Sequence, residues 1–169
     1  MVLSVYCSSQ DLPQSIEKCT AIHKSIYDNA TTIFAQVETL DNESTSKHII
    51  YIEKHTLSKT RNIKKDLKRY NRFLKKCKNK FISLRNSNDN IDSNLTNCIN
   101  DCSNILENCI AIYSEANDYF FEGLETLSYC VEDASYLETC KRSLSRLIHS
   151  LEYLKKELKH LQKSIERIT

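Results

Sequence analysis

The chain has 169 residues, of which 40% are hydrophobic and 27% charged, and its formal net charge is +2. That balance excludes disorder of the low-hydrophobicity, high-charge kind, and the length is typical of one domain. The single glycine and single proline exclude most sheets and tight hairpins, whose turns depend on those residues. The composition therefore predicts an all-α protein with one domain.

The first predicted helix covers about residues 11–40 and follows an N-terminal tail at 1–10. Its apolar residues recur at alternating steps of three and four, which places them on one stripe facing a partner helix. Asp11, with Gln14 three residues later and Pro13 in the first turn, is typical of a helix start. The stripe consists of Leu12, Ile16, Cys19, His23, Ile26, Ala30, Ile33, Val37 and Leu40.

The second predicted helix covers about residues 46–86, after the loop-like sequence DNESTS at 41–46. Short polar side chains of this kind compete for backbone hydrogen bonds and favour loops. The stripe of this helix consists of Ile63, Leu67, Tyr70, Leu74, Cys77, Phe81 and Leu84, with a looser extension back through Ile49, Ile52 and Leu57. The same segment contains the sequence RNIKKDLKRYNRFLKKCKNK at 61–80, which has ten basic residues and one acid, Asp66.

The third and fourth predicted helices cover about residues 91–130 and 136–168, and the sequence NSNDN at 86–90 precedes the third. The spacing of the third stripe continues into the fourth without a break, which would fit one long helix. Between the two stripes, however, that spacing falls on Gly123, Thr126 and Asp133, which do not suit a core. The sequence SYLE at 135–138 resembles a capping box, so we expect a turn at about 131–135. The third stripe consists of Ile91, Leu95, Cys98, Cys102, Ile105, Cys109, Ile112, Ala116 and Tyr119. The fourth consists of Leu137, Cys140, Leu144, Leu147, Leu151, Leu154, Leu158, Leu161, Ile165 and Ile168.

Four long helices joined by short loops predict an antiparallel, up-down-up-down four-helix bundle with coiled-coil-like heptad packing. Residues 11–169 would form this single bundle domain. The alternative is an elongated, dimeric helical rod, in which the third and fourth helices are continuous and a second chain completes the stripe.

The cysteines of the chain favour a core role over a disulfide or metal role. Seven of the eight fall on the stripes or on their direct continuation, and a free cysteine packs as a small apolar group. Disulfides would require secretion, and the zinc alternative has only the spacing CINDC, without a second pair of ligands. Cys7 lies off the stripes and is therefore the thiol that we expect to be most reactive.

The sequence contains no motif that indicates catalysis or a cofactor. It has no phosphate-binding loop, no HExxH and no haem-attachment motif. Di-iron bundles use two Glu-x-x-His motifs and two further glutamates, whereas this chain has one such motif, Glu157 to His160, and both residues lie off the stripe. We therefore predict a protein that is not an enzyme and binds no metal or cofactor.

The expected cellular location follows from the absence of signal-peptide and membrane-spanning patterns in the sequence. The start, MVLSVYCSSQDL, has no basic region and too few apolar residues for a signal-peptide core. No stretch approaches the roughly 18 apolar residues of a membrane-spanning helix. We expect a cytoplasmic or nuclear protein without a transmembrane segment, and the alternative is secretion by a non-classical route.

Charge is divided unequally between the second and third predicted helices. Residues 54–85 contain thirteen basic residues and one acid, whereas residues 86–140 contain eleven acids and no lysine or arginine. In an antiparallel hairpin this division predicts three ion pairs along the seam: Arg85 with Asp92, Lys80 with Asp101, and Lys59 with Glu122. The same register would place Asp66 opposite Glu115.

Seven cations of the second helix occupy heptad positions that point away from this seam, and we call them the basic face: Arg61, Lys65, Lys68, Arg69, Arg72, Lys75 and Lys76. The leading prediction is a non-enzymatic protein-protein interaction module built on the helical bundle, either an adaptor, an assembly subunit or an effector, with the basic face as its candidate partner-binding site. The alternative is binding to nucleic acid or to an anionic membrane surface. Specific reading of nucleic acid is disfavoured, because Tyr70 and Phe73 lie on or beside the stripe and cannot stack on bases. Association into a homo-oligomer is a further alternative.

Overall fold

The computed structural model describes the backbone of residues 2–44, 46–86 and 93–167, and the side chains of these ranges from Pro13 onward. The described residues form four α-helices and one short 3-10 helix, and none of them lies in a strand. The elements are α1 (Val2–Glu38), α2 (Ser46–Asn86), α3 (Ser93–Tyr129), η1 (Ala134–Tyr136) and α4 (Leu137–Glu166). The prediction of an all-α protein is confirmed.

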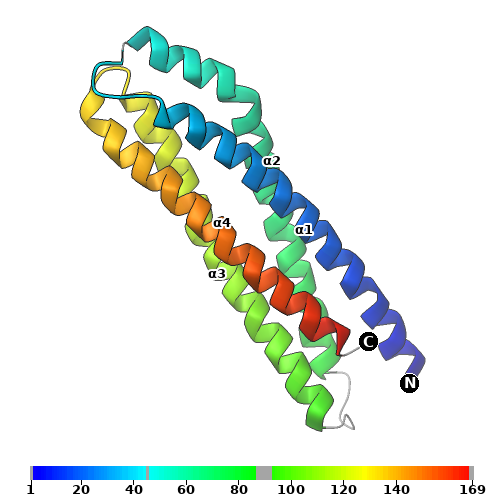
Figure 1. Cartoon of the computed structure of the whole chain (residues 1–169). Helices are drawn as coiled ribbons and strands as arrows, with labels where there is room; N and C mark the ends of the chain where they lie inside the picture. Colours follow the sequence, from blue (N-terminus) through cyan, green and yellow to red (C-terminus); the bar gives the residue numbers. More distant parts are fainter. Residues whose placement is uncertain (1, 45, 87–92, 168–169) are drawn as a thin grey trace.

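The four helices pack as a bundle around one core (Figure 1). α1 packs against α2 and α4, and α3 packs against the same two helices. Both chain ends lie near one end of the bundle, and the connections from α1 to α2 and from α3 to α4 lie near the other. Within the described residues, no helix is long and apolar enough to cross a membrane.

α3 and α4 are separate helices that pack side by side, so the alternative of one continuous rod is wrong for this chain. The break falls at the predicted place, but the predicted capping box at 135–138 is wrong. The side chain of Asp133 accepts a hydrogen bond from the backbone N–H of Ser135 over 2.9 Å and caps η1 instead. Tyr136 precedes α4 and provides no side-chain cap. The 3-10 turn places Ser135 inside η1, where its side chain cannot cap α4.

α1 begins at Val2, earlier than the predicted start near Asp11, so residues 2–10 are helical where we expected a tail. Pro13 consequently lies inside the helix rather than in its first turn. Proline has no N–H and removes one hydrogen bond from a helix, but a helix can continue past a proline with a kink. A proline therefore marks a helix start only weakly.

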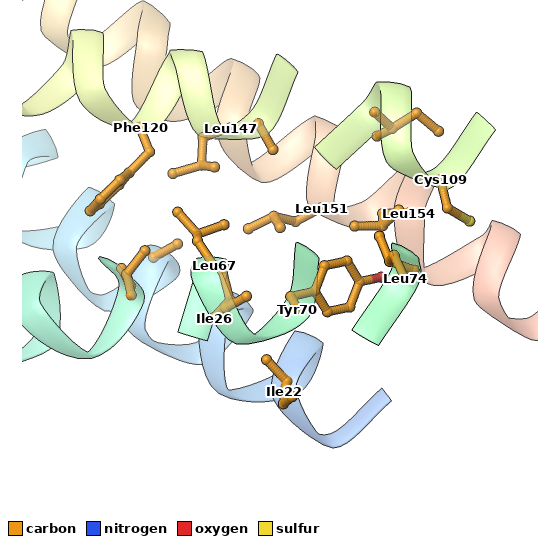
Figure 2. Close-up of a cluster of buried hydrophobic side chains, with 14 of the residues drawn as sticks. Ile22, Ile26, Leu67, Tyr70, Leu74, Cys109, Phe120, Leu147, Leu151 and Leu154 are labelled. Carbon is orange, nitrogen blue, oxygen red and sulfur yellow. The ribbon is translucent and has the colours of Figure 1, made fainter. Parts of the chain in front are cut away.

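The predicted stripes of α1, α2 and α4 form most of the core. From Ile16 onward, every described residue of those three stripes is buried except Leu57, which is 45% exposed, while Thr56 is buried in its place. Figure 2 shows Ile22 and Ile26 of α1, Leu67 and Tyr70 of α2, and Leu151 and Leu154 of α4 converging on the centre of the bundle. Leu12, Ile91 and Ile168 of the predicted stripes lie outside the described side chains.

The predicted stripe of α3 is wrong at several positions. Leu95, Cys98, Ile105 and Tyr119 are only half-buried, and the fully buried residues are Ile99, Cys102, Leu106, Cys109, Ile112, Ala116, Phe120, Gly123, Thr126 and Leu127. Apolar residues stand next to each other in this helix, as in the pair Tyr119 and Phe120. Either member of such a pair satisfies steps of three and four, so the spacing alone cannot decide which one faces the core.

Gly123 and Thr126 were predicted to be unsuitable for the core, and the structure shows the opposite. A Cβ atom added at Gly123 would lie 2.7 Å from Cδ2 of Leu144, so the glycine permits a close approach between α3 and α4. Thr126 donates from its hydroxyl to the carbonyl of Glu122 over 2.7 Å and stays satisfied when buried. The thiol of Cys140 contacts the carbonyl oxygen of Gly123 at 3.3 Å in the same region.

Candidate functional site

All seven cations of the basic face are exposed in the structure: Arg61, Lys65, Lys68, Arg69, Arg72, Lys75 and Lys76. The opposite side of the same stretch of α2 carries Ile63, Leu67, Tyr70, Leu74 and Cys77, all buried. Within the described residues, Arg69 is the one member of the basic face with an ion pair, at 3.4 Å from Asp66. The other six present their charge to solvent.

The seam between α2 and α3 has a different register from the one predicted. Lys78 forms an ion pair with Glu107 over 3.2 Å, and the rings of Tyr70 and Tyr113 lie 5.9 Å apart. These contacts place α2 and α3 a few residues away from the predicted alignment.

The shifted register breaks the predicted ion pairs that lie within the described residues. Lys80 and Asp101 form none, and neither do Lys59 and Glu122, whereas Arg85 with Asp92 lies outside the described side chains. Glu122 instead accepts a hydrogen bond from the hydroxyl of Ser143 on α4 over 2.7 Å. Exposed ion pairs contribute only about 0 to 1 kcal/mol each, so apolar packing decides the register against them.

Asp66, the one acid in the basic tract, was predicted to face Glu115 on α3, and this prediction is wrong. Asp66 is buried at 8% exposure. One of its carboxylate oxygens accepts a hydrogen bond from the hydroxyl of Ser25 on α1 over 2.8 Å, and the other accepts one from Arg69. The carboxylate therefore connects α2 to α1 and leaves the basic face without an acid of its own.

A set of exposed apolar side chains lies where α2 begins and α3 ends, and we call it the apolar end: Ile50, Tyr51, Leu57, Phe121, Tyr129 and Tyr136. The hydroxyl of Ser46 donates to the carbonyl of Val131 over 2.8 Å and holds these two regions together. The rings of Tyr129 and Tyr136 lie 5.2 Å apart. Exposed aromatic side chains are typical of protein interfaces.

A cavity of about 300 Å³ lies between α1 and α4, and no pattern in the sequence indicated it. We call it the α1–α4 cavity, and its lining consists of Thr20, His23, Lys24, Tyr27, Asp28, Lys155, Leu158, Lys159 and Gln162. His23, which the spacing of apolar residues placed on the first stripe, is 3% exposed, and its Nε2 lies 2.7 Å from the carbonyl oxygen of Leu151.

The cysteines behave as core residues rather than as reactive groups. All seven described cysteines are free thiols, and all of them except the half-buried Cys98 are buried. Burial raises the pKa of Cys102, Cys109 and Cys140 to about 12. The exception is Cys77, because a hydrogen bond from the Cys19 thiol lowers the pKa of Cys77. The side chain of Cys7, predicted to be the most reactive thiol, lies outside the described side chains.

Tyr70 is a polar residue in an unfavourable position. Its hydroxyl is buried and has no hydrogen-bond partner among the described residues. Burial raises the pKa of Tyr70 well above its usual value. Figure 2 shows its ring among the leucines of the core, so it takes no part in the basic face.

The described residues contain no group of three or more His, Cys, Asp or Glu side chains that could hold a metal ion. Comparison with protein-family models, with curated proteins and with solved structures finds no match for the chain. Its function therefore has to be argued from the basic face, the apolar end and the α1–α4 cavity.

Proposed function

We propose that the chain is a non-enzymatic protein-protein interaction module, whose basic face binds an acidic surface on a partner protein. The observation that carries this proposal is the exposure of all seven cations of that face, with one ion pair among them in the part of the chain that the structure describes. A charged face of this kind steers an oppositely charged partner and fixes its orientation.

A protein partner is favoured over nucleic acid by the position of the aromatic residues. Tyr70 is 1% exposed and Phe73 is half-buried, so neither of these two rings of the basic stretch offers an open platform on which a base could stack. Four exposed aromatic residues, Tyr51, Phe121, Tyr129 and Tyr136, lie at the apolar end instead, and such residues supply the contact area of protein interfaces. Binding to nucleic acid or to an anionic membrane surface is the competing outcome of the experiment below.

Site-specific photo-crosslinking tests the proposal. A photoreactive amino acid replaces Arg72 in the middle of the basic face, and the chain is expressed in its native cell and irradiated. We expect a crosslinked protein whose contact surface is acidic. The purified partner should then bind more weakly as salt is added, because screening weakens attraction between exposed charges.

A matched pair of variants shows whether the charges of the basic face are responsible. The variant Lys65→Glu/Arg69→Glu/Arg72→Glu/Lys76→Glu should weaken binding of the partner by about tenfold or more. The control Lys47→Glu/Lys54→Glu/Lys156→Glu/Lys163→Glu makes the same charge change at exposed positions outside the face and should have little effect. Crosslinking to nucleic acid or lipid alone, or equal losses in the two variants, would contradict the proposal.

A further inference from the structure

The α1–α4 cavity is independent of the basic face and has the features of a ligand site. Its volume of about 300 Å³ lies at the lower end of the range of small-molecule pockets, which runs from about 300 to 1,000 Å³. The rings of His23 and Tyr27 line it and lie nearly parallel, with centroids 6.3 Å apart and an angle of 16° between their planes. Leu158 adds an aliphatic surface from α4. These groups suit the flat apolar body of a small ligand.

His23 gives the cavity a buried ring whose charge state affects which ligand can bind. A carbonyl oxygen only accepts, so Nε2 of His23 carries the proton that it donates to Leu151. Burial lowers the pKa of His23, which keeps the ring neutral near pH 7. A core histidine with only a structural role needs no cavity beside it.

The charges around the cavity select the sign of the ligand. Lys24 from α1 and Lys155 and Lys159 from α4 line it, and Asp28 is the one acid in the lining. Three lysines and one aspartate give the lining a net charge of +2 while His23 is neutral. All three lysines are exposed to solvent. Such a lining attracts an anion and repels a cation.

We propose that the α1–α4 cavity binds a small aromatic acid, with its ring system against His23, Tyr27 and Leu158 and its anionic group at Lys155 and Lys159. Binding at this site links α1 to α4 and stabilises the folded chain by a free energy that rises with the logarithm of ligand concentration once this exceeds the dissociation constant.

Calorimetry with 2-naphthoate as the probe tests this proposal on the full chain. We expect saturable binding of one molecule of 2-naphthoate per chain. The dissociation constant of the uncharged 2-naphthalenemethanol should be about tenfold higher. The ring protons of His23, assigned by comparison with His23→Gln, should shift on addition of 2-naphthoate. Absence of saturable binding, or equal affinity for the charged and uncharged probes, would overturn the proposal.

Two matched pairs of variants locate the site. The variant Lys155→Glu/Lys159→Glu should weaken binding by about tenfold, whereas Lys156→Glu/Lys163→Glu, the same charge change on α4 outside the lining, should change it by less than about twofold. Thr20→Trp fills the cavity from an exposed position and should abolish binding, and Glu17→Trp is its control outside the lining. Circular dichroism confirms that each variant is folded. Binding that survives Thr20→Trp, or falls equally in both lysine pairs, shows that the probe does not occupy this cavity.

Discussion

α3 and α4 line the same core but contribute to it in different ways. α4 buries seven leucines: Leu137, Leu144, Leu147, Leu151, Leu154, Leu158 and Leu161. α3 buries a mixture that includes Cys102, Cys109, Ala116 and Gly123. Large side chains fill the core, whereas small ones let the neighbouring helix approach. We therefore expect the free energy of unfolding to fall most when side-chain atoms are removed from α4, and to fall when atoms are added to the small residues of α3.

The largest effect is expected from Leu151→Ala on α4. Leu151 is 1% exposed, and truncating a buried leucine costs about 2–5 kcal/mol of the free energy of unfolding, because a cavity remains. Urea denaturation measures this loss. Tyr153→Ala on the same helix is the control, since Tyr153 is 50% exposed and should lose less than about 0.5 kcal/mol. A loss below about 1 kcal/mol for Leu151→Ala would show that α4 does not fill the core as described.

An intermediate effect is expected from Gly123→Ala on α3. The new methyl group would meet Leu144, and such overpacking costs about 1–3 kcal/mol. A gain of up to about 1 kcal/mol in helix propensity offsets part of that cost. In a Leu144→Ala background the steric cost disappears and only the gain remains, so Gly123→Ala should become stabilising.

A double-mutant cycle over these two positions separates the steric term from helix propensity. We expect a coupling free energy above about 0.5 kcal/mol between positions 123 and 144. Additive effects of the two substitutions would show that Leu144 moves aside without cost, and that α3 tolerates added atoms as well as any other helix.

The smallest effect is expected from Tyr70→Phe on α2, where the ring faces α3. The hydroxyl is buried without a partner among the described residues, so the folded chain bears the free-energy cost of removing it from water. Replacing Tyr70 by phenylalanine removes that cost. The free energy of unfolding should therefore rise, by roughly 1 kcal/mol. Tyr113→Phe is the control, because Tyr113 is only half-buried and should change little. A loss of stability in Tyr70→Phe would mean that its hydroxyl has a stabilising contact.

The difference between α3 and α4 also explains how far the sequence predicts the fold. In α4 the only apolar residues off the stripe are Ile148 and Tyr153, so steps of three and four leave one choice of stripe over most of the helix, and every described position of that stripe is buried. In α3, neighbouring apolar residues such as Ile105 and Leu106 leave two choices. In the structure Leu106 is buried and Ile105 is half-buried. Only the partner helices decide between such neighbours.

The candidate sites also differ in how far the sequence predicts them, because some depend on one helix alone and others depend on how two helices meet. The exposure of the basic face follows from positions within one helix. The heptad pattern was therefore sufficient to place its seven cations on the outward side. The bond between Asp66 and Ser25 depends on how α2 meets α1. The α1–α4 cavity likewise combines residues more than a hundred positions apart, such as Thr20 and Leu158. No local pattern in the sequence carries that information.

The buried thiols of the core connect the redox chemistry of the chain to its folding. In the folded chain the thiols of Cys102, Cys109 and Cys140 are shielded from solvent and stay protonated at neutral pH. Unfolding exposes them together and returns the pKa of each to about 8.5, where thiol–disulfide exchange becomes rapid. Oxidants would then lock unfolded chains into mispaired disulfides, so reversible refolding requires a reductant. Heating in air would consequently inactivate the protein permanently, whereas heating with dithiothreitol would not.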